Sequence, residues 1–122
     1  MSSSEFSRIC KELYIINETV NIEANKNYIK FYTYNENTNI QGSFTLQSND
    51  SENVELQCKI EIDSVVNLSF ALSYLNIATK VSSIGQQVNL FLSKELPLMV
   101  QYKLAELGEL KFYLAPRIDE NK

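Results

Sequence analysis

Two stretches near the end of the chain decide the fold, Leu96-Pro97-Leu98-Met99-Val100-Gln101-Tyr102-Lys103-Leu104 and Leu110-Lys111-Phe112-Tyr113-Leu114-Ala115-Pro116. In both, apolar and polar residues alternate or nearly alternate, which is the period of a half-buried β-strand. The link between them, residues 105–109, is short and polar and contains one glycine. We therefore expect a β-hairpin that ends at Pro116, because proline has no N–H to donate to a neighbouring strand.

The end of this hairpin has two interpretations. An exposed Tyr-Leu-Ala-Pro segment, residues 113–116, beside Leu96 and Pro97 would be a good place to dock an apolar peptide. The same residues could instead complete the hydrophobic core, which is the commoner fate of apolar side chains. The alternation does not separate the two, so both stay open.

Length and composition predict one globular domain. The chain has 122 residues, of which 44% are hydrophobic, and a net charge of -4. No apolar run approaches the roughly 18 residues of a membrane span, and no basic and apolar leader is visible after Met1. Cys10 and Cys58 fit buried free thiols in a reducing compartment, although a disulfide or a metal pair stays open.

Missing residue types argue against an enzyme. The sequence contains no histidine, which removes the usual general base and the commonest zinc ligand. Gly42, Gly85 and Gly108 are its only glycines, too few for a phosphate-binding loop. We expect no metal and no cofactor. A hydrolase that acts through carboxylates alone is the remaining enzymatic hypothesis, tested by mutating Glu5 or Asp119.

Two helices are predicted. The first carries one apolar stripe at i, i+3, i+4 and i+7, formed by Phe6, Ile9, Cys10 and Leu13. Ser2 has capping-box spacing to Glu5, and Ser4 is an equally good N-cap. The second helix is expected over residues 70–79, entered from residues 67–69, with Phe70, Ala71, Tyr74, Leu75 and Ala78 on its apolar side.

Alternating segments predict the remaining strands, over residues 19–24, 28–34, 39–47, 54–62 and 88–93. Short polar turns join them, including Asn25-Lys26-Asn27. Two helices and six or seven strands with such connections predict an antiparallel α+β domain with its helices on one sheet face.

Three segments carry a resemblance to a known family. They are Ser4-Glu5-Phe6-Ser7-Arg8-Ile9-Cys10-Lys11-Glu12-Leu13, Leu68-Ser69-Phe70-Ala71-Leu72-Ser73-Tyr74-Leu75 and Leu110-Lys111-Phe112-Tyr113-Leu114-Ala115-Pro116-Arg117-Ile118. In this order they resemble the second half of proliferating cell nuclear antigen, the eukaryotic DNA sliding clamp. The resemblance covers essentially the whole chain, and its Phe-Tyr-Leu-Ala-Pro ending is specific.

The resemblance implies a non-enzymatic processivity factor of the nucleus. Subunits of this family have two similar domains, and three of them close into a ring around duplex DNA. DNA polymerases, nucleases, ligases, repair proteins and the clamp loader would dock through peptides of the form Gln-x-x-aliphatic-x-x-aromatic-aromatic. A subunit of the related heterotrimeric checkpoint clamp is the alternative, which the Leu-Ala-Pro ending argues against.

Family positions transfer onto this sequence as sites. The pocket for partner peptides corresponds to Ala71, Leu96, Pro97, Tyr113, Leu114, Ala115 and Pro116. The DNA-facing wall of helices corresponds to Arg8, Lys11 and Lys80, which would otherwise be an ordinary solvated helix face. Ser73 stands where family members often carry a basic residue. Lys26 aligns with the family's regulatory ubiquitin-acceptor lysine.

The resemblance also assigns the subunit interface. Its edge strand corresponds to Asn39, Ile40, Gln41, Gly42, Ser43, Phe44, Thr45, Leu46 and Gln47. The partner strand would belong to the first domain, which residues 1–122 lack, together with most of the second domain's first strand. Because this chain holds one of the two interface surfaces, we expect it alone to form no stable ring.

Overall fold

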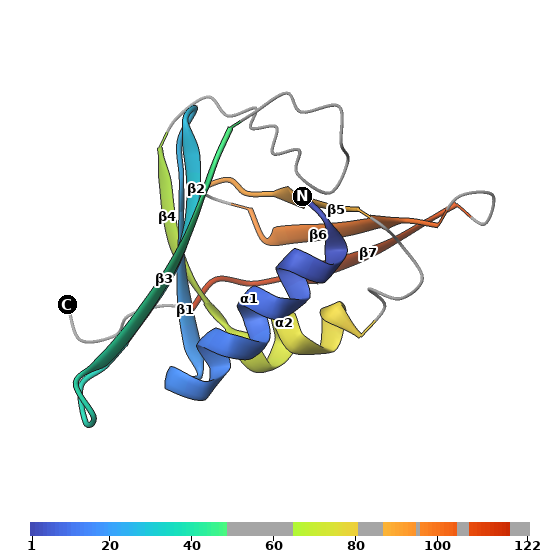
Figure 1. Ribbon diagram of the computed structural model, residues 1–122. Coiled ribbons are helices and arrows are strands. Elements are labelled where there is room, and N and C mark those ends of the chain that lie inside the picture. The colour runs from blue at the N-terminus through green and yellow to red at the C-terminus, as the bar shows by residue number, and fades with distance from the viewer. Residues whose placement is uncertain (49–64, 81–86, 95, 105–107, 118–122) are drawn as a thin grey trace.

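The computed structural model describes residues 1–48, 65–80, 87–94, 96–104 and 108–117, and all structural statements below concern these residues (Figure 1). The elements in chain order are α1 (Ser3–Ile16), β1 (Thr19–Ala24), β2 (Tyr28–Asn35), β3 (Ile40–Gln47), β4 (Val66–Ala71), α2 (Leu72–Thr79), β5 (Val88–Phe91), β6 (Leu98–Lys103) and β7 (Glu109–Leu114). They form two antiparallel sheets and two helices, which confirms the predicted α+β fold class.

The first sheet has four strands in the order β3-β2-β1-β4. Its centre is apolar on the side of the helices, where Ile22 of β1 lies opposite Phe31 of β2, and Val20 lies opposite Phe70 of β4. These side chains are at most 1% exposed. The predicted alternation of β1 and β2 is therefore confirmed.

The second sheet contains the predicted hairpin. Its three strands follow the order β5-β6-β7, and the inward row Leu98, Val100 and Tyr102 of β6 is fully buried. The backbone N–H of Leu104 donates to the carbonyl of Gly108 (2.8 Å) where the hairpin closes. The strands are shorter than predicted, so that residues 96–97 and 115–116 lie outside β6 and β7.

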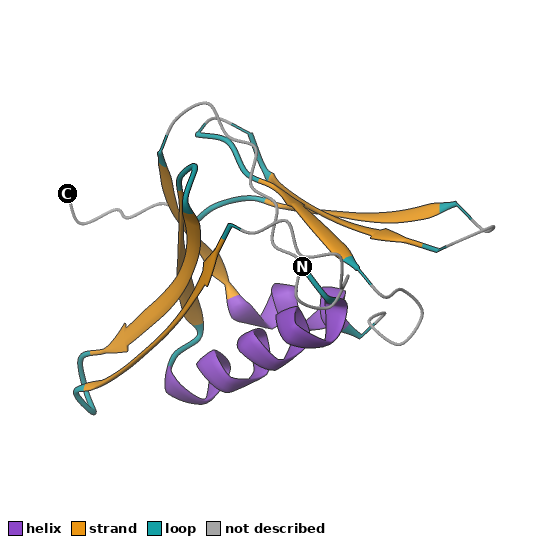
Figure 2. Cartoon of the chain, turned by 45° about the horizontal axis from the view of Figure 1, so that its top comes forward, coloured by secondary structure: helices purple, strands orange, loops and turns teal. Residues whose placement is uncertain are grey.

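Both helices lie side by side in the angle between the two sheets (Figure 2). The predicted stripe of α1 is confirmed, since Phe6, Ile9, Cys10 and Leu13 are at most 1% exposed. These residues share one hydrophobic core with β1, β2 and the inward row of β6. The helices thus connect the two sheets through a common interior.

The prediction for the second helix was wrong at its beginning. Phe70 and Ala71 belong to β4, where they lie opposite Val20 and Thr19 of β1, and α2 begins at Leu72. Val66, Leu68 and Phe70 alternate with polar residues, so the strand period competes with the helical spacing there. Pairing with all of β1 decides in favour of the strand. Tyr74, expected on the apolar side, is 64% exposed.

The residues ahead of α1 pair with the start of β5. Ser2 forms an antiparallel bridge with Gln87, and the Val88 N–H donates to the Met1 carbonyl (3.0 Å). The predicted strand over residues 54–62, with Cys58, lies outside the described residues. No helix among the described residues is both long and apolar enough to cross a bilayer.

Candidate functional site

A groove lies on the outer face of the three-stranded sheet, away from the helices. We call it the outer groove. It has a volume of about 1060 Å³ and is lined by β5, the segment that follows it, β6 and β7. Its apolar lining includes Phe91, Leu96, Pro97, Met99 and Tyr113, and its basic residues are Lys103 and Lys111.

The register of the sheet aligns three large side chains across the outer groove. Phe91 of β5 lies opposite Met99 of β6, and Met99 lies opposite Tyr113 of β7. Residues opposite one another in adjacent strands point to the same face, so the three form one row. Phe91 is 50% and Tyr113 is 66% exposed. Such a row of exposed apolar side chains is typical of a binding surface.

Polar side chains occupy the next positions along the strands. The amide of Asn89 donates to Gln101 Oε1 (3.1 Å), and the Gln101 amide donates in turn to the Glu109 carboxylate. Lys111 Nζ lies 3.1 Å from Glu109 Oε1. The hydrogen bond from Lys111 lowers the pKa of Glu109, and the same contact raises the pKa of Lys111. Both groups are therefore held in their charged forms.

The predicted peptide pocket is divided between two places. Leu96, Pro97 and Tyr113 line the outer groove, whereas the side chain of Leu114 is buried in the core. Ala115 is exposed, and Pro116 and Ala71 are half-buried.

The remaining pocket residues lie where the chain crosses from β7 to the four-stranded sheet. The Arg117 N–H donates to the Ser69 carbonyl of β4 (2.7 Å), and the Arg117 guanidinium donates to Thr19 Oγ1 of β1 (3.1 Å). These bonds hold the segment after β7 against the end of β4 that contains Ala71.

Phe91, Met99, Lys103 and Lys111 were not predicted as site residues. A signal for them existed, because the alternation that turns Leu90, Val100 and Phe112 inward turns the intervening residues outward. The sequence did not show that three large apolar side chains fall into one row, since that depends on the register between strands.

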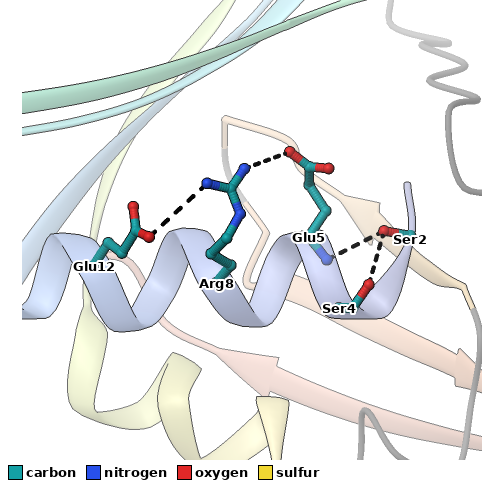
Figure 3. Close-up of polar contacts among 5 residues, drawn as sticks. All are labelled: Ser2, Ser4, Glu5, Arg8 and Glu12. Carbon is teal, nitrogen blue, oxygen red and sulfur yellow. Dashed lines mark hydrogen bonds and ion pairs between the residues drawn. The ribbon is translucent and has the colours of Figure 1, made fainter.

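The predicted DNA-facing cations differ in their surroundings, and Figure 3 shows those of Arg8. The Arg8 guanidinium lies 3.0 Å from the Glu5 carboxylate and 3.9 Å from that of Glu12, all on α1. It also lies over the ring of Phe44 in β3, 5.4 Å from its centroid. Arg8 is thus partly neutralised by two carboxylates.

Lys11 of α1 and Lys80, at the end of α2, are both exposed. Within the described parts of the chain, neither makes an ion pair. Their ammonium groups are therefore the more available cations of the helix surface. The two helices also carry exposed apolar side chains, namely Tyr14, Ile15, Tyr74 and Ile77.

The predicted interface strand corresponds to β3. Among the described strands it occupies one edge of the four-stranded sheet, with Ile40 51% exposed. The prediction was one residue too long, because Asn39 has a left-handed backbone (φ 57°) and belongs to the turn before β3. Its side-chain oxygen accepts a hydrogen bond from the Tyr34 hydroxyl (2.8 Å).

Lys26 is exposed in the turn between β1 and β2. The Asn25 side chain orders this turn by accepting from the backbone N–H groups of Asn27 (2.8 Å) and Tyr28 (3.0 Å). The role of Lys26 as a modification site stays a prediction.

Comparison with protein families gives a match that spans nearly the whole chain. Residues 1–117 match the family model described as proliferating cell nuclear antigen, C-terminal domain. The chain belongs to this family. It is therefore a DNA sliding-clamp domain, from a family of non-catalytic processivity factors that bind DNA and replication proteins in general.

Proposed function

We propose that this domain acts in a homotrimeric processivity clamp in the nucleus, where the ring encircles duplex DNA. In the whole clamp, the edge of β3 would pair with a strand of the neighbouring subunit. The outer groove would dock DNA polymerases, nucleases, ligase and the clamp loader through their peptide motifs. The observation that carries the docking role is the row of exposed apolar side chains, ending in Tyr113, that crosses the outer sheet face of a clamp domain.

The physical argument for docking rests on exposed apolar area in a concave place. Tyr113 is largely exposed and lines the outer groove together with Pro97 and Lys111, although it occupies a regular strand. A partner aromatic or aliphatic side chain placed there would bury that ring together with its own surface. Anchors of this kind dominate the free energy of many interfaces.

A peptide titration tests the proposal. The consensus peptide Gln-x-x-aliphatic-x-x-aromatic-aromatic should bind the clamp, and Tyr113→Ala should cost about 2 kcal/mol of binding free energy, roughly thirtyfold in Kd. Because Tyr113 is exposed, the variant should fold normally. Tyr14→Ala, which removes another exposed tyrosine from α1, is the matched control and should bind as wild type.

Calorimetry on the three proteins decides the outcome. Equal affinities for wild type and Tyr113→Ala would exclude the outer groove as the docking site. A wild-type protein that ignores the consensus peptide altogether would favour the checkpoint-clamp alternative over the homotrimeric clamp.

A further inference from the structure

The apolar surface of the outer groove extends well beyond Tyr113. Phe91 and Met99 continue the row across β6 to β5, so a bound side chain has apolar contacts on three strands. Phe91 is 50% exposed in the described chain. A large aromatic side chain left open on a strand next to a groove has no evident function in packing the core. It enlarges the surface that an anchor can cover.

The other end of the groove is basic. Lys103 of β6 lies opposite Glu109 of β7, and Lys111 contacts the same carboxylate at 3.1 Å. Lys111 is paired with this carboxylate, whereas Lys103 makes no ion pair among the described residues, so the two lysines and one glutamate leave a local charge of about +1 beside the apolar row. The local field matters more to a bound group than the net charge of -4 of the chain.

Strand geometry fixes the distance between the apolar row and these lysines. Side chains two residues apart on one face are separated by about 6.6 Å, and those four residues apart by about 13 Å. Lys111 is two residues from Tyr113, and Lys103 is four residues from Met99. A peptide that lies extended along the strands has the same rise per residue. One of its side chains can therefore contact the apolar row while another, two or four residues away, approaches a lysine.

We propose that the outer groove selects peptides in which an acidic residue lies two to four residues from the aromatic or aliphatic anchor. The anchor covers Phe91, Met99 and Tyr113, and the peptide carboxylate approaches Lys103 and Lys111. This inference rests on the proposed docking function and specifies the chemistry of the partner. One added charge pair at a solvated site should change the Kd by about two- to fivefold.

Synthetic peptides with one shared consensus motif test the selection. The first peptide has serines on both flanks. The second carries glutamates two and four residues before the aromatic pair, and the third carries them two and four residues after it. The fourth carries lysines at all of these positions. At low salt, one of the glutamate peptides should bind wild type about two- to fivefold more tightly than the serine peptide. The lysine peptide should bind more weakly than both, and about 0.5 M salt should remove the differences.

Three variants assign the selection to its residues. Lys103→Gln should abolish the preference for glutamate, whereas Lys26→Gln, the same charge change in the turn between β1 and β2, should retain it. Phe91→Thr introduces a β-branched residue, which suits a strand, and should weaken every peptide about five- to tenfold, whatever its charge.

The outcomes separate this inference from the docking proposal. If Tyr113→Ala weakens the serine peptide but neither glutamate peptide is preferred, docking stands and the acidic selection is wrong. A preference that survives in Lys103→Gln also overturns it, as does unchanged binding in Phe91→Thr. If Tyr113→Ala has no effect on any peptide, the docking proposal itself fails.

Discussion

Gly42 and Gly108 are required for different reasons. Gly108 has φ +101°, a conformation that residues with a Cβ rarely adopt, and a Cβ built there meets nothing within 4 Å. Gly42 of β3 faces α1, and a Cβ built there would come within 2.6 Å of Ile16 Cδ1 and 3.3 Å of Leu13 Cδ2. The first glycine serves the backbone of the hairpin, and the second permits close packing of a helix on a strand.

Alanine substitutions distinguish these two reasons. Gly108→Ala should lower the free energy of unfolding by about 1 to 3 kcal/mol, because the cost lies in the backbone and cannot be relieved by neighbouring side chains. Gly42→Ala should also destabilise, but Ile16→Ala should recover much of that loss in the double variant. Urea unfolding of the single and double variants provides the values. Ile16→Ala should not rescue Gly108→Ala.

Cys10 makes stability depend on pH. The thiol is 1% exposed, and its burial raises the pKa from 9.0 to about 12. Between these values the unfolded chain loses the thiol proton while the folded chain retains it. The unfolded state therefore binds fewer protons, and stability falls as pH rises from about 9 towards 12.

The expected loss from Cys10 is about 1.4 kcal/mol for each pH unit well above 9. Urea unfolding at pH 8 and pH 10 should show a smaller decrease in Cys10→Ala than in wild type, whatever the two absolute stabilities are. Tyr102, whose pKa is raised from 10.0 by burial and by the nearby Cys10, affects stability mainly above pH 10 and therefore adds little to either decrease. Parallel pH profiles for the two proteins would contradict the shifted thiol.

At the scale of elements, the start of α1 shows which of the two candidate residues, Ser2 or Ser4, is the N-cap of the helix. The backbone N–H of Glu5 donates to Ser2 Oγ (3.1 Å), so Ser2 is the N-cap, and Ser4 lies inside the first turn (Figure 3). The Glu5 carboxylate is engaged with Arg8. The spacing of a capping box thus located the cap, while the side chain of its glutamate takes another partner.

Removing this cap should weaken the helix. Ser2→Ala should lower the free energy of unfolding by about 1 kcal/mol, because it leaves the Glu5 N–H without its acceptor. Ser4→Ala, on an exposed side chain in the first turn, should change stability by no more than about 0.5 kcal/mol. Thermal unfolding of both variants is the measurement. A larger loss from Ser4→Ala would assign the cap to Ser4.

Elements whose apolar residues follow one clear period, helical or strand, could be predicted from the sequence. Elements whose apolar residues fit both periods could not. The i, i+3, i+4 stripe of α1 and the alternation of β1, β2 and β6 each match the observed burial. In Val66–Ala71 the apolar residues satisfy the strand period, while Phe70 and Ala71 also satisfy a helical spacing with Tyr74. The choice depends on β1, whose six residues all pair with β4. Local sequence does not contain that partner.

The candidate site was predictable in part, at the end of the terminal hairpin. The hairpin pattern and the family resemblance both pointed to Leu96, Pro97 and Tyr113, and all three line the outer groove. Phe91 and Met99 join them through strand register, which alternation along one strand does not reveal. Leu114, which was also predicted for the pocket, alternates with Tyr113 along β7, and its side chain is buried in the core.

At the scale of the whole molecule, an acidic chain must present a surface that tolerates DNA. The net charge is -4, and the helices contribute both signs to the face they share. Arg8 is flanked by the carboxylates of Glu5 and Glu12, so this triad has a charge of about -1. Lys11 and Lys80 are exposed and form no ion pair among the described residues. The cations of this face should therefore contribute unequally to phosphate binding.

The salt dependence of DNA binding by the assembled clamp measures this inequality. Lys11→Ala and Lys80→Ala should each flatten the slope of log affinity against log salt by about 0.9 if each lysine contacts one phosphate. Arg8→Ala should flatten it less, because the guanidinium already has two carboxylate partners. Glu12→Gln should raise the affinity by releasing part of the Arg8 charge, and Lys26→Ala, in a turn of the sheet, should leave the slope unchanged.

If the triple variant of Arg8, Lys11 and Lys80 keeps the wild-type slope, these residues form an ordinary solvated helix face, and retention on DNA depends on encirclement alone.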